Sequence, residues 1–498
     1  MNKLIKISIW AMIPVLMVGC KKDYLETNPA SDVINTLIFT NTTNAKTALE
    51  GMYRLTFSHA PAVGYGAGAL HADFGQKAYD LVNDLMGNDM VVHSGGYGWF
   101  NRDYQYTEHL RIQDNSRPHV MWAYYYTLIN NANNIIVNID KADGPAADKE
   151  SMKGQALAMR GYCYYNLINY FQQTYKGNEN AKGVPVYTVP ATVGVGRGTV
   201  QQVYTQIIND LTAAELLLNG KAAEDKSHIG LRAVQGIRAR VALTMEDWPK
   251  AAQYAALART GYTPMPSTEY TKGFSSATNP EWIWGTPIQV QEQTTIFASF
   301  YSHMDAQSNG GVSYAGLGGQ KKITKDLYDQ INAADIRKTL FRTPGTGTSG
   351  VPDYCQTKMR LVNPASWLGD YLFMRAGEMY LIEAEALSRQ GNDGGARTAI
   401  QTLVQARFPA YTAASLSGTA LLNEIILQRR IELWGEGFSW FDIKRLKVGL
   451  NRPTGIGNHG AFNPGQTVLP AGDILFAWKI CQKEFNANLA FTVADQNP

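Results

Sequence analysis

The sequence predicts a mostly α-helical fold, in which paired helices form a scaffold that carries long irregular loops. Apolar residues recur at helical spacing over several long segments. A pattern of small residues followed by a proline occurs twice, in residues 230–264 and 375–409, and each copy spans about 34 residues. Long loops are predicted where Gly, Pro, Ser, Asn and aromatic residues gather, namely in residues 59–117, 265–320 and 341–369. Such loops in a large fold are often functional.

Residues 1–19 are predicted to be a signal peptide rather than part of the fold. Lys3 and Lys6 form a positive start, and residues 7–18 form an apolar stretch too short to span a bilayer. The segment ends in a glycine before Cys20, as bacterial lipoprotein signals do. We expect Cys20 to be lipidated and to tether the mature chain to a membrane, with an ordinary signal peptide as the alternative. Removal of the two lysines lowers the formal net charge from +3 to +1.

The remaining chain is predicted to form a polar tether and one composite fold. Residues 20–43 are the expected tether, and residues 44–498 the fold. We divide this fold into an N-terminal helical part, a loop-rich binding insertion, a C-terminal repeat and a tail, at residues 44–260, 261–370, 371–450 and 451–498.

Long helices are predicted in the first half of the fold. Their apolar spacing places them at residues 44–58, 118–140, 150–172 and 199–218. The last one opens with Thr199-x-x-Gln202, a capping box that satisfies backbone N–H groups at the helix start. Aromatic and asparagine side chains at helical spacing in residues 122–135 indicate core packing and hydrogen bonds between helices.

The repeated pattern predicts pairs of closely packed helices. Ala239, Ala251 and Pro264 in the first copy have the same spacing as Ala384, Ala396 and Pro409 in the second. Small residues let two helices approach closely, and a proline ends a helix. The period and these positions resemble tetratricopeptide repeats. Gly161 and Tyr164 match the first helix of such a pair, and the extended segment GVPVYTVP at residues 183–190 is expected to replace its second helix.

Composition excludes several classes of function. Charged residues make up 17% of the chain and the net charge is small, so electrostatic binding of nucleic acid is not expected. Cys163, Cys355 and Cys481 form no metal-binding motif and are an odd number, which excludes a full disulfide framework. No catalytic or cofactor motif is present, and we predict neither an enzyme nor a cofactor. The sequence leaves open whether a calcium ion lies in the loops.

Two aromatic loops are the best candidates for a binding site. A flat ring packs against the C–H face of a sugar, while amides and charged groups nearby bind its hydroxyls. The first loop, HSGGYGWFNRDYQY, and the second, FASFYSHMDAQSNGGVSYAG, both combine rings with such groups. The predicted glycan contacts are Tyr97, Trp99, Phe100, Tyr104, Tyr301, Asp305, Asn309 and Tyr314. The alternative for each ring is that it anchors its loop on the core.

Charged residues in RRIELWGEGFSWFDIKR, at residues 429–445, are predicted to form a buried structural network around Trp434 and Trp440. Its members are Arg429, Arg430, Glu432, Glu436, Asp442 and Arg445.

Four segments resemble the SusD/RagB family of outer-membrane nutrient-binding lipoproteins. ILQRRIELWGEGFSWFDIKRL is similar to the C-terminal signature of that family, and YLFMRAGEMYLIEAEAL to its second motif. CKKDYLETNP is similar to the mature N-terminus, and WKICQKEFNANLAF to the closing motif. In the closing motif, Cys481 and Leu489 replace two prolines.

The resemblance implies a tetratricopeptide-like helical fold with a loop-built binding face. It implies a lipid anchor at Cys20, a place at the outer-membrane surface of Bacteroidota, and a role as lid on a SusC-type TonB-dependent transporter that takes up glycans. Trp99 lies where family members often place a stacking ring, and Tyr301 and Tyr314 lie in a region that often supplies others. Peptide or other nutrient cargo, a protein-binding scaffold and a glycosidase are the alternatives.

Overall fold

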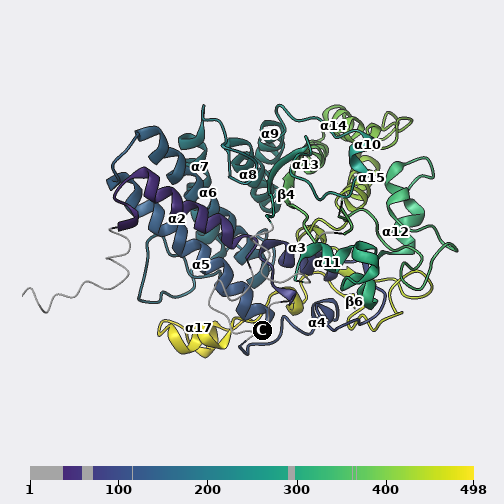
Figure 1. Ribbon diagram of the computed structural model, residues 1–498, viewed down its shortest axis with the longest axis horizontal. Helices are drawn as coiled ribbons and strands as arrows, with labels where there is room; N and C mark the ends of the chain where they lie inside the picture. The colour runs from purple at the N-terminus through teal and green to yellow at the C-terminus, as the bar shows by residue number, and fades with distance from the viewer. Residues whose placement is uncertain (1–36, 59–70, 115, 290–297, 362, 366) are drawn as a thin grey trace, which may run out of the picture.

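A computed structural model describes residues 37–58, 71–114, 116–289, 298–361, 363–365 and 367–498 of the chain. The signal peptide, Cys20 and most of the tether lie outside the described residues. Helices dominate the fold (Figure 1), which confirms the predicted class. The proposed division of residues 44–498 into four parts stays a prediction.

Long helices form the left-hand side of the molecule as drawn in Figure 1. They are α2 (Thr42–Leu55), α5 (Arg117–Asn138), α6 (Ala146–Phe171) and α7 (Val200–Leu218). Each begins and ends close to its predicted bounds. The Thr199 side chain accepts a hydrogen bond from the backbone of Gln202, and the Gln202 side chain accepts one from the backbone of Thr199, so the capping box is present.

The two repeat copies form the predicted helix pairs. The first is α8 (Leu231–Met245) with α9 (Trp248–Ala258), and the second is α13 (Ala376–Arg389) with α14 (Asp393–Gln405). The small residues of the pattern are fully buried in both copies, at Ala239, Ala251, Ala384 and Ala396. Helix α9 also packs against α13, so the pairs stack on each other. Both second helices end several residues before their prolines, which lie in the turns that follow.

The expectation that residues 183–190 replace a second helix is wrong. Helix α7 packs along α6 as its second helix, and a Cβ on Gly161 would lie 3.1 Å from the Leu211 side chain of α7. The 183–190 segment instead lies on α5 and α6, where Asn133 donates to the carbonyls of Tyr187 and Val189. This segment lies between α6 and α7 in the sequence, so the second helix of the pair begins later in the chain than predicted.

The prediction that residues 59–117 are irregular is also wrong in part. Helix α3 (Gln76–Leu85) lies within this range, and nine of its ten residues are buried. Ala78, Leu81, Val82 and Leu85 have helical spacing, which is a signal that predicts this helix.

Further elements, most of them short, complete the fold. The helices are α4 (Asn101–Tyr104), α10 (Ser267–Tyr270), α11 (Phe300–Met304), α12 (Lys325–Gln330), α15 (Gly418–Glu432), α16 (Ser439–Arg445) and α17 (Gln482–Ala487). Three antiparallel two-stranded ladders join β1 (Met90–Val92) to β3 (Lys321–Ile323), β2 (Trp282–Thr286) to β4 (Tyr371–Arg375), and β5 (Leu450–Asn451) to β6 (Val468–Leu469). One hydrophobic cluster contains residues from Phe39 to Phe491.

The predicted ion network forms only in part, and its partners come from distant segments; the Arg430 side chain is 39% exposed rather than buried. Arg375 binds Glu281, Glu432 and Glu436, and all four side chains are buried. Arg337 and Arg407 also bind Glu432. The other predicted members form separate groups, because Asp442 binds Arg429 and Arg445, and Arg430 binds Asp89. Trp434 donates to the carbonyl of Asp89, whereas Trp440 packs on Tyr170 and Trp478.

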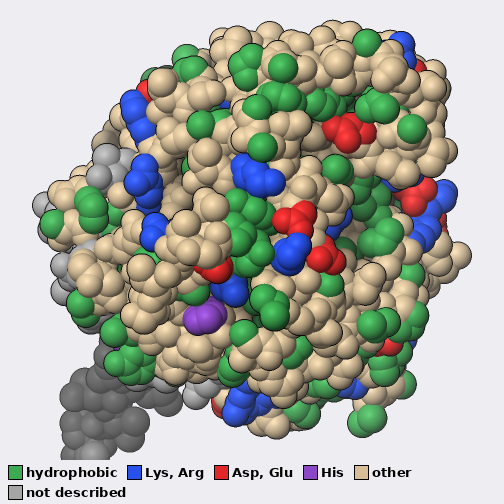
Figure 2. Space-filling view, turned by 90° about the vertical axis from the view of Figure 1, so that its right-hand side faces the viewer, with side chains coloured by type: hydrophobic (Ala, Val, Ile, Leu, Met, Phe, Trp, Pro, Cys, Tyr) green, Lys and Arg blue, Asp and Glu red, His purple; other side chains and the backbone are tan. Residues whose placement is uncertain are grey.

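Surface charge is sparse and mixed on the face shown in Figure 2. Lys and Arg side chains lie there among Asp and Glu, separated by uncharged surface. A large field of one sign, as nucleic-acid binders carry, is therefore not seen on this face. In the described part of the chain, every helix is too short or too polar to cross a bilayer.

Candidate functional site

The β1–β3 ladder brings the two predicted aromatic loops together. Val92 pairs with Lys321, so the chain leaving β1 lies beside the chain entering β3. The Ser94 hydroxyl donates to the carbonyl of Gly318 and links the two loops directly. Segments far apart in sequence thus form one surface.

Glycines make this close approach possible. Gly96 and Gly318 both have positive φ, and a Cβ on Gly96 would lie 3.1 Å from the backbone nitrogen of Gly319. A side chain at Gly96 would therefore be strained and would push the loops apart. The first loop is closed by Asn101, whose side-chain amide donates to the carbonyl of Gly95.

Three predicted rings gather with His71 into what we call the aromatic crevice, made of His71, Tyr97, Trp99 and Tyr314. Trp99 stacks on His71 with ring centroids 5.1 Å apart, and its edge contacts Tyr314 at 6.1 Å. Tyr97 meets Tyr314 edge-on at 5.5 Å. Tyr97 is 67% exposed, and Trp99 and Tyr314 are half-buried. The rings are therefore fixed by one another while part of their surface faces solvent.

Polar groups lie around the aromatic crevice. The Tyr314 hydroxyl lies 2.5 Å from Nδ1 of His71. Lys321 and Asn101 line the same hollow, and burial lowers the pKa of Lys321 to about 8. His303 stacks beneath Tyr314, and burial lowers its pKa to about 3, so its imidazole is neutral and donates from Nε2 to the carbonyl of His71. The hollow has a volume of about 10 Å³, room for about one water molecule, so a larger ligand would lie across it.

The other predicted contacts lie elsewhere. Phe100, Tyr104, Tyr301 and Asp305 are at least nine-tenths buried. The Tyr301 hydroxyl donates to backbone carbonyls, and the Asp305 carboxylate accepts from the backbone of Gln307, Ser308 and Leu361. A side chain enclosed in this way offers no free face to a ligand. These four residues therefore support the loops, and we do not include them among the proposed glycan contacts. Asn309 lies in a 3₁₀ turn, and its side chain is outside the described part.

Sequence reasoning missed His71, Asn101 and Lys321. His71 is one of eight scattered histidines, and no spacing links it to Trp99. Asn101 was visible as a polar residue within the first aromatic loop. Lys321 becomes part of the site only through the β1–β3 pairing.

The comparisons with known proteins match most of the chain. A family model described as "Starch-binding associating with outer membrane" matches residues 63–243, and one described as "SusD family" matches residues 363–490. A SusD-like protein P2 from Formosa agariphila is 23% identical over 87% of this chain and 89% of its own.

Solved structures agree with these matches. A SusD-like carbohydrate binding protein from Bacteroides vulgatus has a TM-score of 0.78 and 28% identity, over 92% of this chain and 99% of that one. The chain belongs to the SusD family. A surface glycan-binding protein A from Bacteroides uniformis shares the fold at a TM-score of 0.69 and 18% identity, over 91% of this chain and 98% of its own.

Family membership supports a carbohydrate-binding role for this SusD-family chain. The loop with Tyr97 and Trp99 lies inside the first matched range, whereas the loop with Tyr314 lies between the two ranges. Three of the four crevice residues, His71, Tyr97 and Trp99, thus lie within a matched range, and Tyr314 lies between the two ranges.

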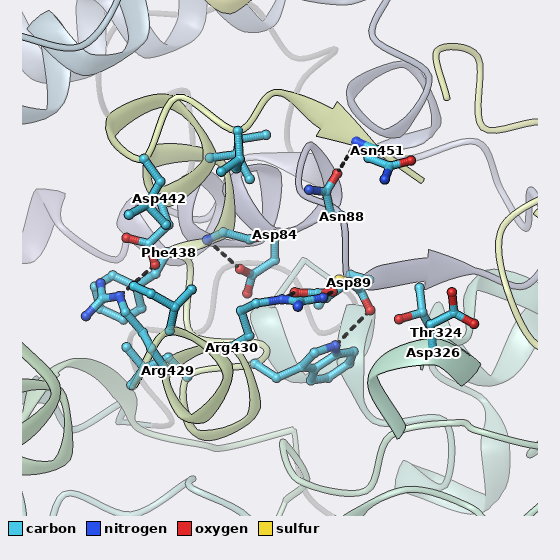
Figure 3. A pocket seen from close by; sticks show the side chains of 18 of the residues that line it. Asp84, Asn88, Asp89, Thr324, Asp326, Arg429, Arg430, Phe438, Asp442 and Asn451 are labelled. Carbon is cyan, nitrogen blue, oxygen red and sulfur yellow. Dashed lines mark hydrogen bonds and ion pairs between the residues drawn. The ribbon is translucent and has the colours of Figure 1, made fainter. Parts of the chain in front are cut away.

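A second hollow of about 430 Å³ lies beside the SusD-family signature (Figure 3). It is at the other end of the β1–β3 ladder, where Met90 and Thr324 line it. Several of its charged groups are engaged within the protein: Arg430 binds Asp89, and the Asp84 carboxylate accepts from the backbone of Gly437. Arg429 binds Asp442 through Nε and keeps one buried guanidinium nitrogen without a hydrogen-bond partner among the described residues. Burial raises the pKa of Asp84 to about 7. Much of its lining comes from the signature, including Arg429, Arg430 and Asp442.

Proposed function

We propose that this SusD-family chain is a non-catalytic surface lipoprotein that binds glycans at the aromatic crevice and delivers them to a SusC-type TonB-dependent transporter. The observation that carries the proposal is the partly exposed group of Tyr97, Trp99 and Tyr314 on rigidly paired loops. The carbohydrate-binding and starch-binding descriptions of its relatives support the choice of a glycan.

The geometry suits a chain of sugar rings. Well-placed ring contacts contribute about 0.5–1.5 kcal/mol each beyond the burial of apolar area. Trp99 and Tyr314 meet edge to face, with an interplanar angle of 64°, and so present differently oriented surfaces to a ligand. Asn101, Tyr314 and Lys321 supply polar groups beside the rings, and the Asn101 amide and Tyr314 hydroxyl also bond Gly95 and His71 within the protein. A neutral ligand also agrees with the small net charge of the chain.

A binding role without turnover is supported by the residues that line the crevice. Glycosidases use two carboxyl groups that flank the bond to be cleaved. Among the described residues that line this hollow there is no carboxylate. Nearby Asp103 is buried and paired with Arg117, where it stabilises the loop.

The proposed lipid anchor is supported by the sequence, and the proposed transporter partner by family membership. Cys20 follows a lipoprotein-type signal, and lipidation there would hold the chain at the outer membrane. A SusC-type barrel is the partner that the family implies.

Isothermal titration of the full chain against a panel of oligosaccharides tests the binding role. We expect saturable heat with at least one glycan, and release of no reducing sugar on prolonged incubation. Heat with peptides alone would contradict glycan cargo, and steady hydrolysis would contradict a non-catalytic role. Co-purification from the native membrane with a TonB-dependent barrel tests the partner, and its absence would contradict delivery.

A further inference from the structure

A histidine and two glutamates meet between the first described helix and the repeat scaffold. Glu50 lies on α2, and Glu224 and His228 lie in the segment that joins α7 to α8. The possible ligand atoms of these three residues lie within 4.8 Å of one another. We call this group the His228 cluster. It shares no residue with the aromatic crevice.

His228 is held firmly in this cluster. Its side chain is 6% exposed, and its ring lies edge-on to Tyr53 with centroids 4.7 Å apart. Nδ1 lies 3.1 Å from a carboxylate oxygen of Asp225 and 2.9 Å from the Ser227 hydroxyl. This arrangement matches the usual outer partner of a metal-bound histidine, where a carboxylate accepts from the second ring nitrogen and orients the first.

The other ring nitrogen points at a second carboxylate. Nε2 of His228 lies 3.1 Å from Oε1 of Glu50. A neutral imidazole has one N–H, so it cannot donate to Asp225 and Glu50 together. An imidazolium can donate to both carboxylates, and a divalent ion bound to Nε2 would take the place of its second proton.

The spacing of these atoms suits a small divalent ion. Zinc binds histidine nitrogen and carboxylate oxygen at about 2.0–2.2 Å in a tetrahedron, which separates two ligands by about 3.3 Å. The 3.1 Å between Nε2 and Glu50 is close to that value. The three ligand atoms spread over up to 4.8 Å, so Glu224, which is about half exposed, would turn inward to complete the site.

Lys46 is the cation that competes with such an ion. Its ammonium lies 2.5 Å from Glu224, and both side chains are about half exposed. Exposed pairs of this kind stabilise a protein by only about 0–1 kcal/mol. A divalent ion bound by three ligands can therefore displace Lys46 at little cost.

We infer that Glu50, Glu224 and His228 form a binding site for a zinc-class divalent cation, with Asp225 orienting His228. An imidazole ligand favours zinc and its transition-metal neighbours over calcium and magnesium, which prefer oxygen alone. The ion would fasten α2, the helix that follows the tether, to the segment before α8. This inference does not depend on the proposed glycan function.

Titration of the untagged, chelator-treated full chain with zinc chloride tests the inference. We expect binding of one ion per chain, and a rise of at least about 2 °C in the unfolding midpoint at saturating zinc. Magnesium and calcium at the same concentration should produce neither effect. Glu50→Gln and Glu224→Gln keep the shape of exposed side chains, and each should weaken zinc binding by at least about tenfold.

Two further variants separate a metal site from a merely structural cluster. Glu150→Gln alters a glutamate of similar exposure that binds Lys221, and it should leave zinc affinity unchanged. Lys46→Gln removes the competing ammonium and should tighten zinc binding several-fold. Absence of zinc binding by the wild-type chain would overturn the inference, as would equal affinities for wild type, Glu50→Gln and Glu224→Gln.

Discussion

The buried ion network and the aromatic crevice use their chemistry in opposite ways. In the network, Arg375 bridges Glu281, Glu432 and Glu436, and every one of these side chains is almost fully enclosed. In the crevice, Tyr97 and Trp99 both pack against Tyr314, and both keep part of their surface in contact with solvent. The difference teaches that charged residues in the family signature serve the fold, whereas the rings on the paired loops are available for a ligand.

Removal of one network carboxylate should have the largest effect. Glu432→Gln leaves Arg337, Arg375 and Arg407 buried with less compensating charge. We expect the free energy of unfolding to fall by about 3–5 kcal/mol. Urea denaturation measures this change. The matched control is Glu269→Gln, which breaks a surface pair with Lys272 and should change stability by less than about 1 kcal/mol. Equal losses in the two variants would remove the distinction between network and surface.

Strong acid should weaken the buried ion network. The arginines around them hold the pKa of Glu432 and Glu436 below the ordinary value despite burial. Their contribution to stability is present above the unfolded-state pKa, about 4.3, and is lost as pH falls through their folded-state values. Asp84 acts in the opposite sense, because burial raises its pKa to about 7 and its protonation favours the fold as pH falls toward 4.

Thermal unfolding between pH 8 and pH 2.5 measures this balance. Buried His303 opposes Asp84, because burial lowers its pKa to about 3 and the unfolded state takes up a proton first as pH falls. The midpoint should therefore change little from pH 7 to pH 5 and fall steeply below about pH 4. A midpoint that keeps rising below pH 4 would contradict the assigned role of the network.

The network also marks how far sequence reasoning extends. Alanines at repeat spacing, such as Ala239 and Ala384, predict helix pairs because each alanine packs between two helices that are neighbours in the sequence. The partners Arg375 and Arg407 of Glu432 come from other segments, and no local pattern names them. The crevice has the same difficulty, since Trp99 and Tyr314 meet only through the pairing of β1 with β3. The composition of both loops predicts a binding role for them. It does not predict which of their rings are buried as anchors and which are exposed to a ligand.

Truncation of the central ring should change binding more than stability. Trp99→Ala removes a half-buried ring that stacks on His71, and we expect glycan affinity to fall at least about tenfold, or about 1.4 kcal/mol. Stability should fall by less than about 1.5 kcal/mol. The matched control is Trp248→Ala, a half-buried tryptophan on α9 that stacks with Arg389 and should leave affinity unchanged. If Trp248→Ala weakened glycan binding and Trp99→Ala did not, the binding site would lie outside the aromatic crevice.

Truncation of the outermost ring should have the smallest effect. Tyr97 is 67% exposed and contacts Tyr314 by its edge. Tyr97→Ala should weaken glycan binding about two- to fivefold and change the free energy of unfolding by less than about 0.5 kcal/mol. Titration and urea denaturation of the same preparation measure both quantities. A stability loss comparable to that of Glu432→Gln would show that this ring serves the fold.

The most direct measurement is a crystal structure of the protein with the tightest-binding oligosaccharide from the panel. The account predicts a sugar ring packed on Trp99 with carbon atoms about 4 Å from the indole, and a second contact at Tyr314 or Tyr97. Density for the ligand in the hollow beside Asp84 and Arg430, with the aromatic crevice free of sugar, would contradict it.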